Sequence, residues 1–257
     1  MEGFDKKSNL NLSYTNLQKS PASQLEFLRV CVSEGQHLMP ITEPHVRNGK
    51  VTGVPKGCCS FLPEGGGRAA IVSNGIDIWP VPEYCDYDVM TCQMKLKGKL
   101  MYVVSLYLDI NFDYIPNALL NLLRKKGNAQ VIIFSDTNAH SSLWGCDEGN
   151  KRGQMVEEFI GTENLVVHNT GTKFTYMSNT GNSIIDVTLS TTAISNEIIG
   201  WHVVDEVPMS DHCRIKCKIS NALSPRSAPK FNLVKTDWNK FQDYSQLHTD
   251  SRTRYMA

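Results

Sequence analysis

Residues 132–145 read IIFSDTNAHSSLWG, and this stretch decides the fold class. It carries an apolar strand directly into Asp136, Asn138 and His140. A strand that only had to turn would more simply use Gly, Pro or a single Asn. In α/β proteins, ligands bind beyond the ends of buried strands, where polar groups gather. The stretch therefore predicts an α/β protein with a functional site at this strand end.

The composition is that of an ordinary globular protein. The 257 residues are 41% hydrophobic and 20% charged, which suits one large domain or a domain with a tail. No apolar run approaches the roughly 20 residues that span a bilayer. The N-terminal MEGFDKKSNLNLSYTN has no apolar segment typical of a secretory signal. We therefore expect an intracellular protein without a membrane contact.

Cysteine usage and net charge bear on whether the protein has disulfides, a zinc site or a nucleic-acid partner. Eight scattered cysteines without a signal peptide predict reduced thiols, and the adjacent Cys58-Cys59 pair has no CxxC partner that would indicate zinc. The 26 basic and 26 acidic residues cancel, so net charge neither favours nor excludes nucleic acid. A nucleic-acid partner would have to be held by local basic patches.

Strand patterns dominate the chain. We expect strands at 9–17, 37–44, 68–74, 87–96, 100–110, 129–136, 164–169, 173–177, 182–190, 198–204 and 212–220. We expect helices at 20–35, 114–126 and 151–161, and a loop at 48–67. The first helix has Ser20 as its N-cap and Pro21 at its first position. Consecutive strands with few helices between them predict two packed sheets with helices outside.

Several strand ends carry polar residues, each with a simpler structural explanation. Glu43 is either a surface charge or a metal ligand, and Tyr107 is either a half-buried strand tyrosine or a site residue. Asp136 and Asn138 are two residues apart, so in extended geometry both side chains point the same way. The alternative for that pair is an Asx-turn.

Asp186 is the most informative acid. It lies in SIIDVTLS, on the face opposite Val187 and Leu189, and a carboxylate inside a β-branched strand is unfavourable unless a partner pairs with it. A histidine is the expected partner, since a buried carboxylate orients and charges an imidazole. Asp211 and His212 supply a candidate immediately before a strand, and their adjacent side chains should diverge towards different partners. The alternative for Asp186 is the solvent face of an edge strand.

The order of these residues resembles the endonuclease/exonuclease/phosphatase family, which includes pancreatic deoxyribonuclease, apurinic-site endonucleases and inositol-polyphosphate phosphatases. The resemblance is more specific to the endonuclease domain of non-long-terminal-repeat retrotransposon polyproteins. It covers roughly residues 9–241 and rests on segments that follow in order without large gaps. They are TNLQKSPAS, ITEPHVRNGKVTGVP, GRAAIVSN, VVSLYLD, SDTNAHSSLWG, NKRGQMVEEFIGTENLVVHNTG, FTY, SIIDVTLS and SDH.

The resemblance implies that one group of residues in the site holds a metal ion, and we call this group the metal side. Glu43 resembles the main metal ligand, Asn16 the metal-side asparagine and Asp211 a second metal-side carboxylate. Asn9 or Asn11 would also fit an Asn-x-Asn start, although NLQKSPAS places Asn16 better. The implied ion is Mg²⁺, with Mn²⁺ as a substitute, because Mg²⁺ takes oxygen ligands and needs only one or two carboxylates.

The resemblance also implies that a second group of residues contacts the phosphate and the attacking water, and we call this group the phosphate side. Tyr107 resembles the phosphate-contacting tyrosine, Asp136 the residue that activates the attacking water, and Asn138 a phosphate contact. His212 resembles the histidine that stabilises the transition state, oriented by Asp186. We expect a hydrogen bond between Asp186 and a ring nitrogen of His212. We also expect seven side chains to line one cleft, those of Asn16, Glu43, Tyr107, Asp136, Asn138, Asp211 and His212.

The chain departs from the family pattern at three positions. The usual Gly-Asp-Phe-Asn is here Ser135-Asp136-Thr137-Asn138, and the usual Gln before Glu-Pro is Thr42. Strand alternation points Thr137 away from the cleft, so we expect the change to cost packing and stability while leaving the mechanism intact.

The resemblance therefore predicts a four-layer α/β sandwich of the deoxyribonuclease-I type over residues 1–222. Residues 223–257 form a polar tail in which KTDWNKF resembles the stretch towards a reverse transcriptase. The implied activity is Mg²⁺-dependent nicking of double-stranded DNA in the nucleus, beside a reverse transcriptase or element RNA. Two alternatives stay open: a catalytically silent DNA-binding remnant, and a phosphoesterase of the same fold that acts on a small substrate.

Overall fold

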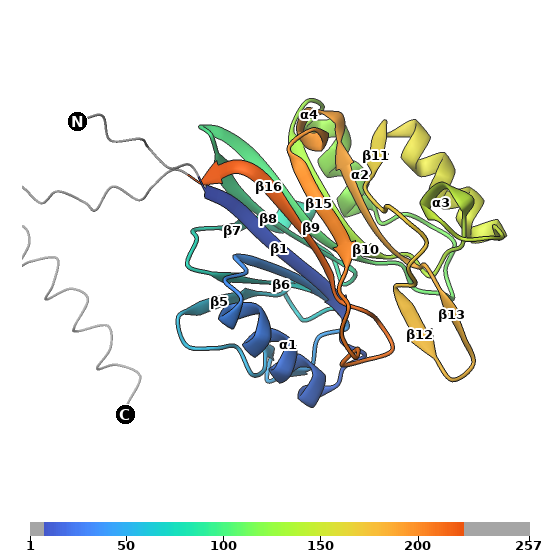
Figure 1. Ribbon diagram of the computed structural model, residues 1–257. Coiled ribbons are helices and arrows are strands. Elements are labelled where there is room, and N and C mark those ends of the chain that lie inside the picture. The colour runs from blue at the N-terminus through green and yellow to red at the C-terminus, as the bar shows by residue number, and fades with distance from the viewer. Residues whose placement is uncertain (1–7, 224–257) are drawn as a thin grey trace, which may run out of the picture. The chain divides into compact units, whose positions relative to one another are not determined.

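The computed structural model describes residues 8–223 (Figure 1). The predicted tail at 223–257, including KTDWNKF, lies outside the described residues apart from Leu223, so the domain boundary stays a prediction. No helix in the described part of the chain is long and apolar enough to cross a membrane.

The first sheet has six strands in the order β15-β16-β1-β2-β6-β5. Only β1 and β2 pair in parallel, so the sheet is mixed. Its strands are β1 (Ser8–Asn16), β2 (Leu38–Thr42), β5 (Cys58–Phe61), β6 (Ala69–Asn74), β15 (Ile198–Val203) and β16 (Ile215–Leu223).

The second sheet also has six strands, in the order β11-β14-β10-β9-β8-β7. Here β9 and β10 form the parallel pair. The strands are β7 (Trp79–Pro80), β8 (Val89–Leu96), β9 (Lys99–Tyr107), β10 (Gln130–Asp136), β11 (Leu165–Val167) and β14 (Asp186–Thr191).

Helices cover the outer faces of the two sheets (Figure 1). They are α1 (Pro21–Ser33), α2 (Asn117–Lys125) and α3 (Lys151–Thr162). The short α4 (Thr192–Ser195) instead contributes Ile194 to the core between the sheets, and 3-10 turns lie at η1 (Pro82–Tyr84) and η2 (Ser142–Trp144). The N-cap of α1 is as predicted, because the Ser20 side chain accepts a hydrogen bond from the backbone N–H of Ser23, and Pro21 stands at the first position.

Three apolar cores separate the four layers. The central core lies between the sheets and includes Leu12, Ile71 and Phe134. A second core packs α2 and α3 on one sheet, and a third packs α1, through residues such as Phe27, on the other. The predicted four-layer α/β sandwich is confirmed, since each sheet has one face on its partner and one on helices.

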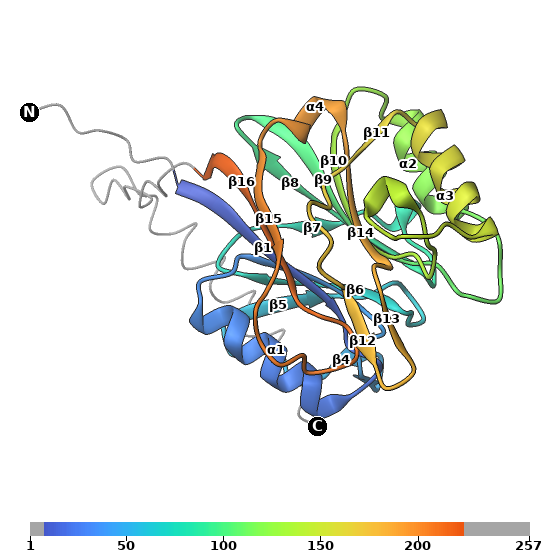
Figure 2. The same cartoon turned by 45° about the vertical axis from the view of Figure 1, so that its right-hand side comes forward.

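Two small hairpins complete the described chain. They are β3 (Val46–Arg47) with β4 (Lys50–Val51), and β12 (Tyr176–Ser178) with β13 (Gly181–Ser183). The β12–β13 hairpin projects from the body in both views (Figures 1 and 2). It forms one wall of the site described below.

The structure corrects three expected elements. The segment 48–67, expected as a loop, contains β4 and the edge strand β5, whose short sequences lack an alternating pattern. The strand expected at 182–190 is interrupted, because the backbone N–H groups of Ile185 and Asp186 both donate to Thr175 Oγ1 (3.0 Å each) instead of to a neighbouring strand. The strand expected to contain Glu43 ends at Thr42.

Candidate active site

Strand register aligns the first three site residues. Asp136, the last residue of β10, pairs with Tyr107 on β9 and with Asp186 on β14, so the three lie in one row across the second sheet. In the first sheet, Asn16 pairs with Thr42 at the ends of β1 and β2. Packing of the two sheets then brings these rows face to face.

A cleft of about 330 Å³ opens at these strand ends. Six of the seven side chains expected to converge there line it, which confirms most of that prediction. The lining residues are Asn16, Gln18, Glu43, Tyr107, Ile110, Asp136, Asn138, His140, Tyr176, Ser183, Ile185 and His212. The roles assigned to them by resemblance stay predictions.

Asp211 is the exception. It does not belong to the lining; its carboxylate accepts a hydrogen bond from Gln18 Nε2 (3.1 Å), and its backbone N–H donates to Gln18 Oε1 (3.1 Å). His212, the next residue, takes the inward direction and lines the cleft. The expectation that Asp211 lines the cleft is therefore wrong, although it reaches the cleft's edge through Gln18.

His212 is held between two buried acids. Its Nδ1 lies 2.9 Å from Asp186 Oδ2, within the expected range, and its Nε2 lies 3.8 Å from Asp136 Oδ2. Asp186 is fully buried, which excludes the solvent-face alternative. Burial alone would lower the pKa of His212, but the negative charges of Asp186 and Asp136 outweigh it and raise that pKa. The imidazole is therefore held in its charged form.

Residues that the sequence did not single out support Asp186. The buried Tyr14 hydroxyl donates to Asp186 Oδ1 (3.1 Å) and shares a hydrogen bond with Thr42 Oγ1 (3.0 Å). Thr175 fixes the backbone on the other side. Thr42 stands where the family pattern has Gln. Tyr14 is two residues before Asn16 and therefore on the same face of β1, and this spacing was the one feature of the sequence that could have indicated its role.

The segment around His212 is fastened on both sides. The Ser210 hydroxyl donates to Asn16 O (2.6 Å) and accepts from the His212 backbone N–H (3.2 Å). The Tyr176 ring meets the imidazole edge to face at 5.0 Å, and a β-bridge joins Tyr176 to His212. The β12–β13 hairpin thus packs directly on the histidine.

Asn16 connects the two sheets across the cleft. Its Nδ2 donates to Asp136 Oδ2 (2.8 Å) and to Glu43 Oε2 (3.2 Å), while its Oδ1 accepts from the backbone N–H of Gln18. Asn11, the alternative at the strand start, instead donates its side chain to Gly35 O in an exposed position. The geometry therefore places Asn16 in the cleft, as expected.

Unusual backbone angles mark the cleft. Gln18, Glu43 and Asn138 have φ of 48°, 45° and 48°, in the left-handed region that non-glycine residues seldom adopt. Such strain concentrates at functional sites. For Asn138 the expected extended geometry is wrong, because the residue turns back and its N–H donates to Asp136 Oδ1 (3.2 Å). The turn still leaves Asn138 in the lining, and its Nδ2 donates to Leu108 O (3.0 Å).

Tyr107 is oriented by an arginine from the first sheet's side. The Arg68 guanidinium lies 4.6 Å from the centroid of the Tyr107 ring and pairs with Asp88 (2.6 Å) and Asp109. Burial, with the charges of Glu43 and Asp136, raises the pKa of Tyr107 to about 12. The hydroxyl therefore stays a hydrogen-bond donor.

The donor set fits a hard divalent cation. Glu43 and Asp136 present carboxylate oxygens to the cleft on either side of Asn16, and Mg²⁺ prefers oxygen ligands of this kind. Asp136, Asp186 and His212 also place one ligand atom each within 4.8 Å of one another. In that trio, however, His212 is held in its charged form, and a protonated imidazole cannot ligate a metal ion. Glu43 and Asn16 are therefore the better pair to hold an ion.

The departures beside Asp136 leave the cleft intact. Ser135 has no positive φ and its hydroxyl donates to Val187 O (2.7 Å), while the Thr137 hydroxyl donates to Ile185 O (2.8 Å). Both are buried and neither lines the cleft, as expected for Thr137. The two hydroxyls thus bond to Val187 of β14 and to Ile185, the residue before that strand.

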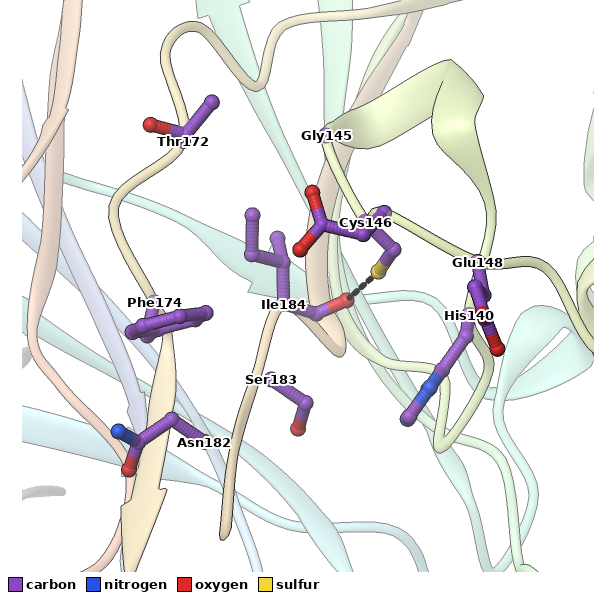
Figure 3. A pocket seen from close by; sticks show the side chains of 10 residues that line it. His140, Gly145, Cys146, Glu148, Thr172, Phe174, Asn182, Ser183 and Ile184 are labelled. Atoms are coloured by element: carbon purple, nitrogen blue, oxygen red, sulfur yellow. Dashed lines mark hydrogen bonds between the residues drawn. The ribbon is translucent and has the colours of Figure 1, made fainter.

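A second cavity of about 520 Å³ adjoins the cleft, and the two share His140 and Ser183 (Figure 3). Phe174 and Asn182 stand on one side, and His140 and Glu148 on the other. The Cys146 thiol closes the back wall through a hydrogen bond to Ile184 O (3.2 Å).

Comparisons with known proteins show the family and the fold of the chain. The family described as endonuclease-reverse transcriptase matches residues 101–216. A Pol polyprotein from the type-1 retrotransposable element R1 of Bradysia coprophila is 31% identical over an alignment of 219 residues, and the match covers 75% of this chain. The chain belongs to the non-long-terminal-repeat retrotransposon endonuclease domains. It spans 22% of the length of the R1 polyprotein.

Solved structures show the same fold for this retrotransposon-type endonuclease domain. The endonuclease domain of TRAS1, a telomere-specific non-LTR retrotransposon, superposes with a TM-score of 0.72 at 22% identity, covering 82% of this chain and 98% of that one. The AP endonuclease LMAP from Leishmania major gives 0.63 at 14% identity (84% and 89% covered). The 3'-5' exonuclease NExo from Neisseria meningitidis gives 0.62 at 16% (82% and 99%).

Proposed function

We propose that this domain is a Mg²⁺-dependent DNA endonuclease that hydrolyses one phosphodiester bond of a duplex and leaves a 3′ hydroxyl. The observation that supports it most directly is the charged His212, held between Asp186 and Asp136 and facing Glu43 and Asn16 across one cleft. The charged His212, and a cation that Glu43 and Asn16 would hold, match the negative charge that develops on a phosphate under attack.

Each residue then has a defined task. Asp136 accepts the proton of the attacking water, since burial raises the pKa of its carboxyl and makes it a better base than an exposed aspartate. The protonated His212 donates to the phosphate oxygen that gains charge, while Asp186 holds its ring in place. Tyr107 donates its hydroxyl to a second oxygen. Glu43 and Asn16 would hold Mg²⁺, which supplies Lewis-acid stabilisation of the phosphate and the leaving oxygen.

The relatives suggest the context of the reaction. The R1 match is to a Pol polyprotein, so we propose that a reverse transcriptase and element RNA act beside this domain, on duplex DNA in the nucleus. Nicking of the duplex would leave a 3′ hydroxyl that could serve as the primer for the reverse transcriptase.

Supercoiled plasmid tests the proposal. We expect open-circle product with Mg²⁺ or Mn²⁺ and none with EDTA. We expect His212→Ala and Glu43→Gln to reduce the rate by on the order of 10²-fold or more, while Glu26→Gln, a matched change of an exposed acid on α1, has no effect. Addition of Mg²⁺ should raise the melting temperature of the wild type but not of Glu43→Gln, which reports ion binding without activity.

Two other outcomes would select the alternatives. Binding of duplex DNA without nicking under any divalent ion identifies the catalytically silent remnant. Rapid hydrolysis of a small phosphoester, with plasmid left intact, identifies a small-substrate phosphoesterase.

A further inference from the structure

Three large apolar side chains stand exposed on the loop between β9 and α2. Ile110, Phe112 and Tyr114 are 66%, 54% and 53% exposed. They alternate with Asn111 and Asp113, and the Phe112 and Tyr114 rings lie 6.1 Å apart. Large apolar groups gathered at one exposed loop typically mark a contact surface.

The loop is built to hold these side chains in place. The buried Arg152 of α3 donates to Asp109 O (2.7 Å) and Phe112 O (2.9 Å), and to the Asp113 carboxylate (3.1 Å). The Asp109 carboxylate in turn accepts from the Asn111 backbone (2.8 Å) and pairs with Arg68. The backbone is therefore fixed at several points, so ordering it on binding costs little conformational entropy.

The same contacts tie the loop to the site. Arg152 Nε donates to the backbone carbonyl of Thr137 (2.9 Å), the residue between Asp136 and Asn138. The Leu108 N–H donates to Asp136 O (2.9 Å). Arg68 also lies over the ring of Tyr107. Ile110 itself lines the cleft. The exposed loop is thus continuous with the place where the phosphate is expected.

The chemistry of the loop favours DNA bases as the occupant. Aromatic side chains stack on bases, and apolar side chains inserted between base steps bend the duplex. The two acids of the loop would repel phosphates, but Asp109 is paired with Arg68 and Asp113 with Arg152. A duplex seated in the cleft would cover Ile110, whereas a protein docked there would block the phosphate's entry.

We propose that the Ile110–Tyr114 loop is a DNA-contact element that packs apolar side chains against the bases beside the scissile phosphate. This inference rests on the proposed nuclease function and adds the part of the substrate that the loop recognises. The loop selects duplex substrates, while the cleft carries the hydrolysis.

The test compares two substrates in the full chain. The variants are Phe112→Ser, Tyr114→Ser and the double change, which leave Ile110 of the cleft lining in place. The matched control is Leu100→Ser, which replaces an exposed apolar residue at the opposite end of β9. We expect each loop change to lower kcat/KM on a duplex oligonucleotide by about 5-fold to 100-fold, the range for loss of one stacking contact. Turnover of bis(p-nitrophenyl) phosphate should stay within about 2-fold.

A fluorescence measurement examines the stacking itself. A duplex carrying 2-aminopurine beside the nick site should brighten on binding wild type in EDTA, because the base loses its stacked neighbours. Phe112→Ser and Tyr114→Ser should remove that change, whereas Tyr114→Phe should keep it.

The inference is overturned if the double variant nicks and brightens DNA like Leu100→Ser. It is equally overturned if the double variant loses both substrates together, since that result makes the loop a structural support of the cleft. A wild type that brightens the duplex but never nicks it contradicts the proposed function alone. A wild type that does neither contradicts both.

Discussion

The hydroxyl oxygen of Tyr14 lies 3.1 Å from Oδ1 of Asp186, and the two residues come from different sheets. This hydrogen bond crosses the central core, where the Tyr14 ring stacks on Phe134 at 5.8 Å. Burial, with the charges of Asp186 and Asp136, raises the pKa of Tyr14, so the phenol stays a donor. The orientation of His212 therefore depends on how the two sheets pack.

Tyr14→Phe should reduce kcat while leaving KM for DNA nearly unchanged. The ring still packs on Phe134, but Asp186 loses a donor and holds His212 less firmly. We expect a stability loss of about 1 kcal/mol, typical of one hydrogen bond, and a several-fold loss of kcat. Steady-state nicking and urea unfolding measure the two effects. Thr42→Val, which leaves the Tyr14–Asp186 bond in place, should affect kcat less; equal losses would contradict the account.

Asp186→Asn should move the alkaline limb of the pH–rate profile to lower pH. Asp186 is one of the two charges that raise the pKa of His212. Without it that pKa falls, so the imidazole loses its proton at a lower pH. We expect turnover at pH 8 to fall by on the order of 10²-fold or more, with a smaller loss at pH 6. A histidine titration followed by NMR provides the independent check, and an unchanged profile would show that the charge of His212 is not required.

Glu34→Gln should make the unfolding free energy fall less steeply as the pH is lowered. Hydrogen bonds from the buried Arg214, with Lys216 nearby, lower the pKa of Glu34 from 4.5 to about 2. A carboxyl with a lowered folded-state pKa stabilises the fold above its unfolded pKa, and that stability is lost as pH falls towards the folded value. Unfolding free energies between pH 2 and 6 should therefore vary less in the variant.

The matched control for this prediction is Glu26→Gln on the same helix. Glu26 pairs with Arg29 in an exposed position, so the change should alter the pH dependence very little. Equal flattening in both variants would mean that general surface charge, not the Arg214 contact, sets the acid limit.

Gly153→Ala should destabilise the domain, although Gly→Ala inside a helix normally stabilises by about 1 kcal/mol. A Cβ at Gly153 would lie 1.8 Å from the carbonyl oxygen of His140, which is backbone and cannot move alone. The segment that leads from Asp136 into α3 would have to shift. Gly161→Ala, on the same helix with open space around its Cβ, is the control and should stabilise. Thermal unfolding of both variants decides, and two stabilised variants would refute the close contact.

Sequence reasoning predicted the parts of the site that burial makes unfavourable without a partner. Asp186 within a β-branched strand required a counter-charge, and His212 supplies it. Reasoning from alternation failed where the backbone leaves extended geometry, as at Asn138 and Glu43, whose positive φ no pattern reveals. It also failed for Asp211, because alternation separates neighbours without telling which one faces inward.

The supporting residues were beyond prediction for a different reason. Thr175 and Tyr14 act through contacts with residues 11 and 172 positions away, which only the packed sheets create. The short strand β5 was missed because an edge strand paired on one side needs no alternating pattern.

The pairing of β1 with β16 has a consequence for synthesis. These strands come from opposite ends of the described chain, yet Tyr14 pairs with Ile215, close to both Asn16 and His212. Closing a loop of about 200 residues is entropically costly, and such distant pairing slows folding. During synthesis on the ribosome, β1 can pair with β2 early, but it can pair with β16 only after that strand has been made. A growing polypeptide therefore completes its cleft only after residues beyond His212 have emerged.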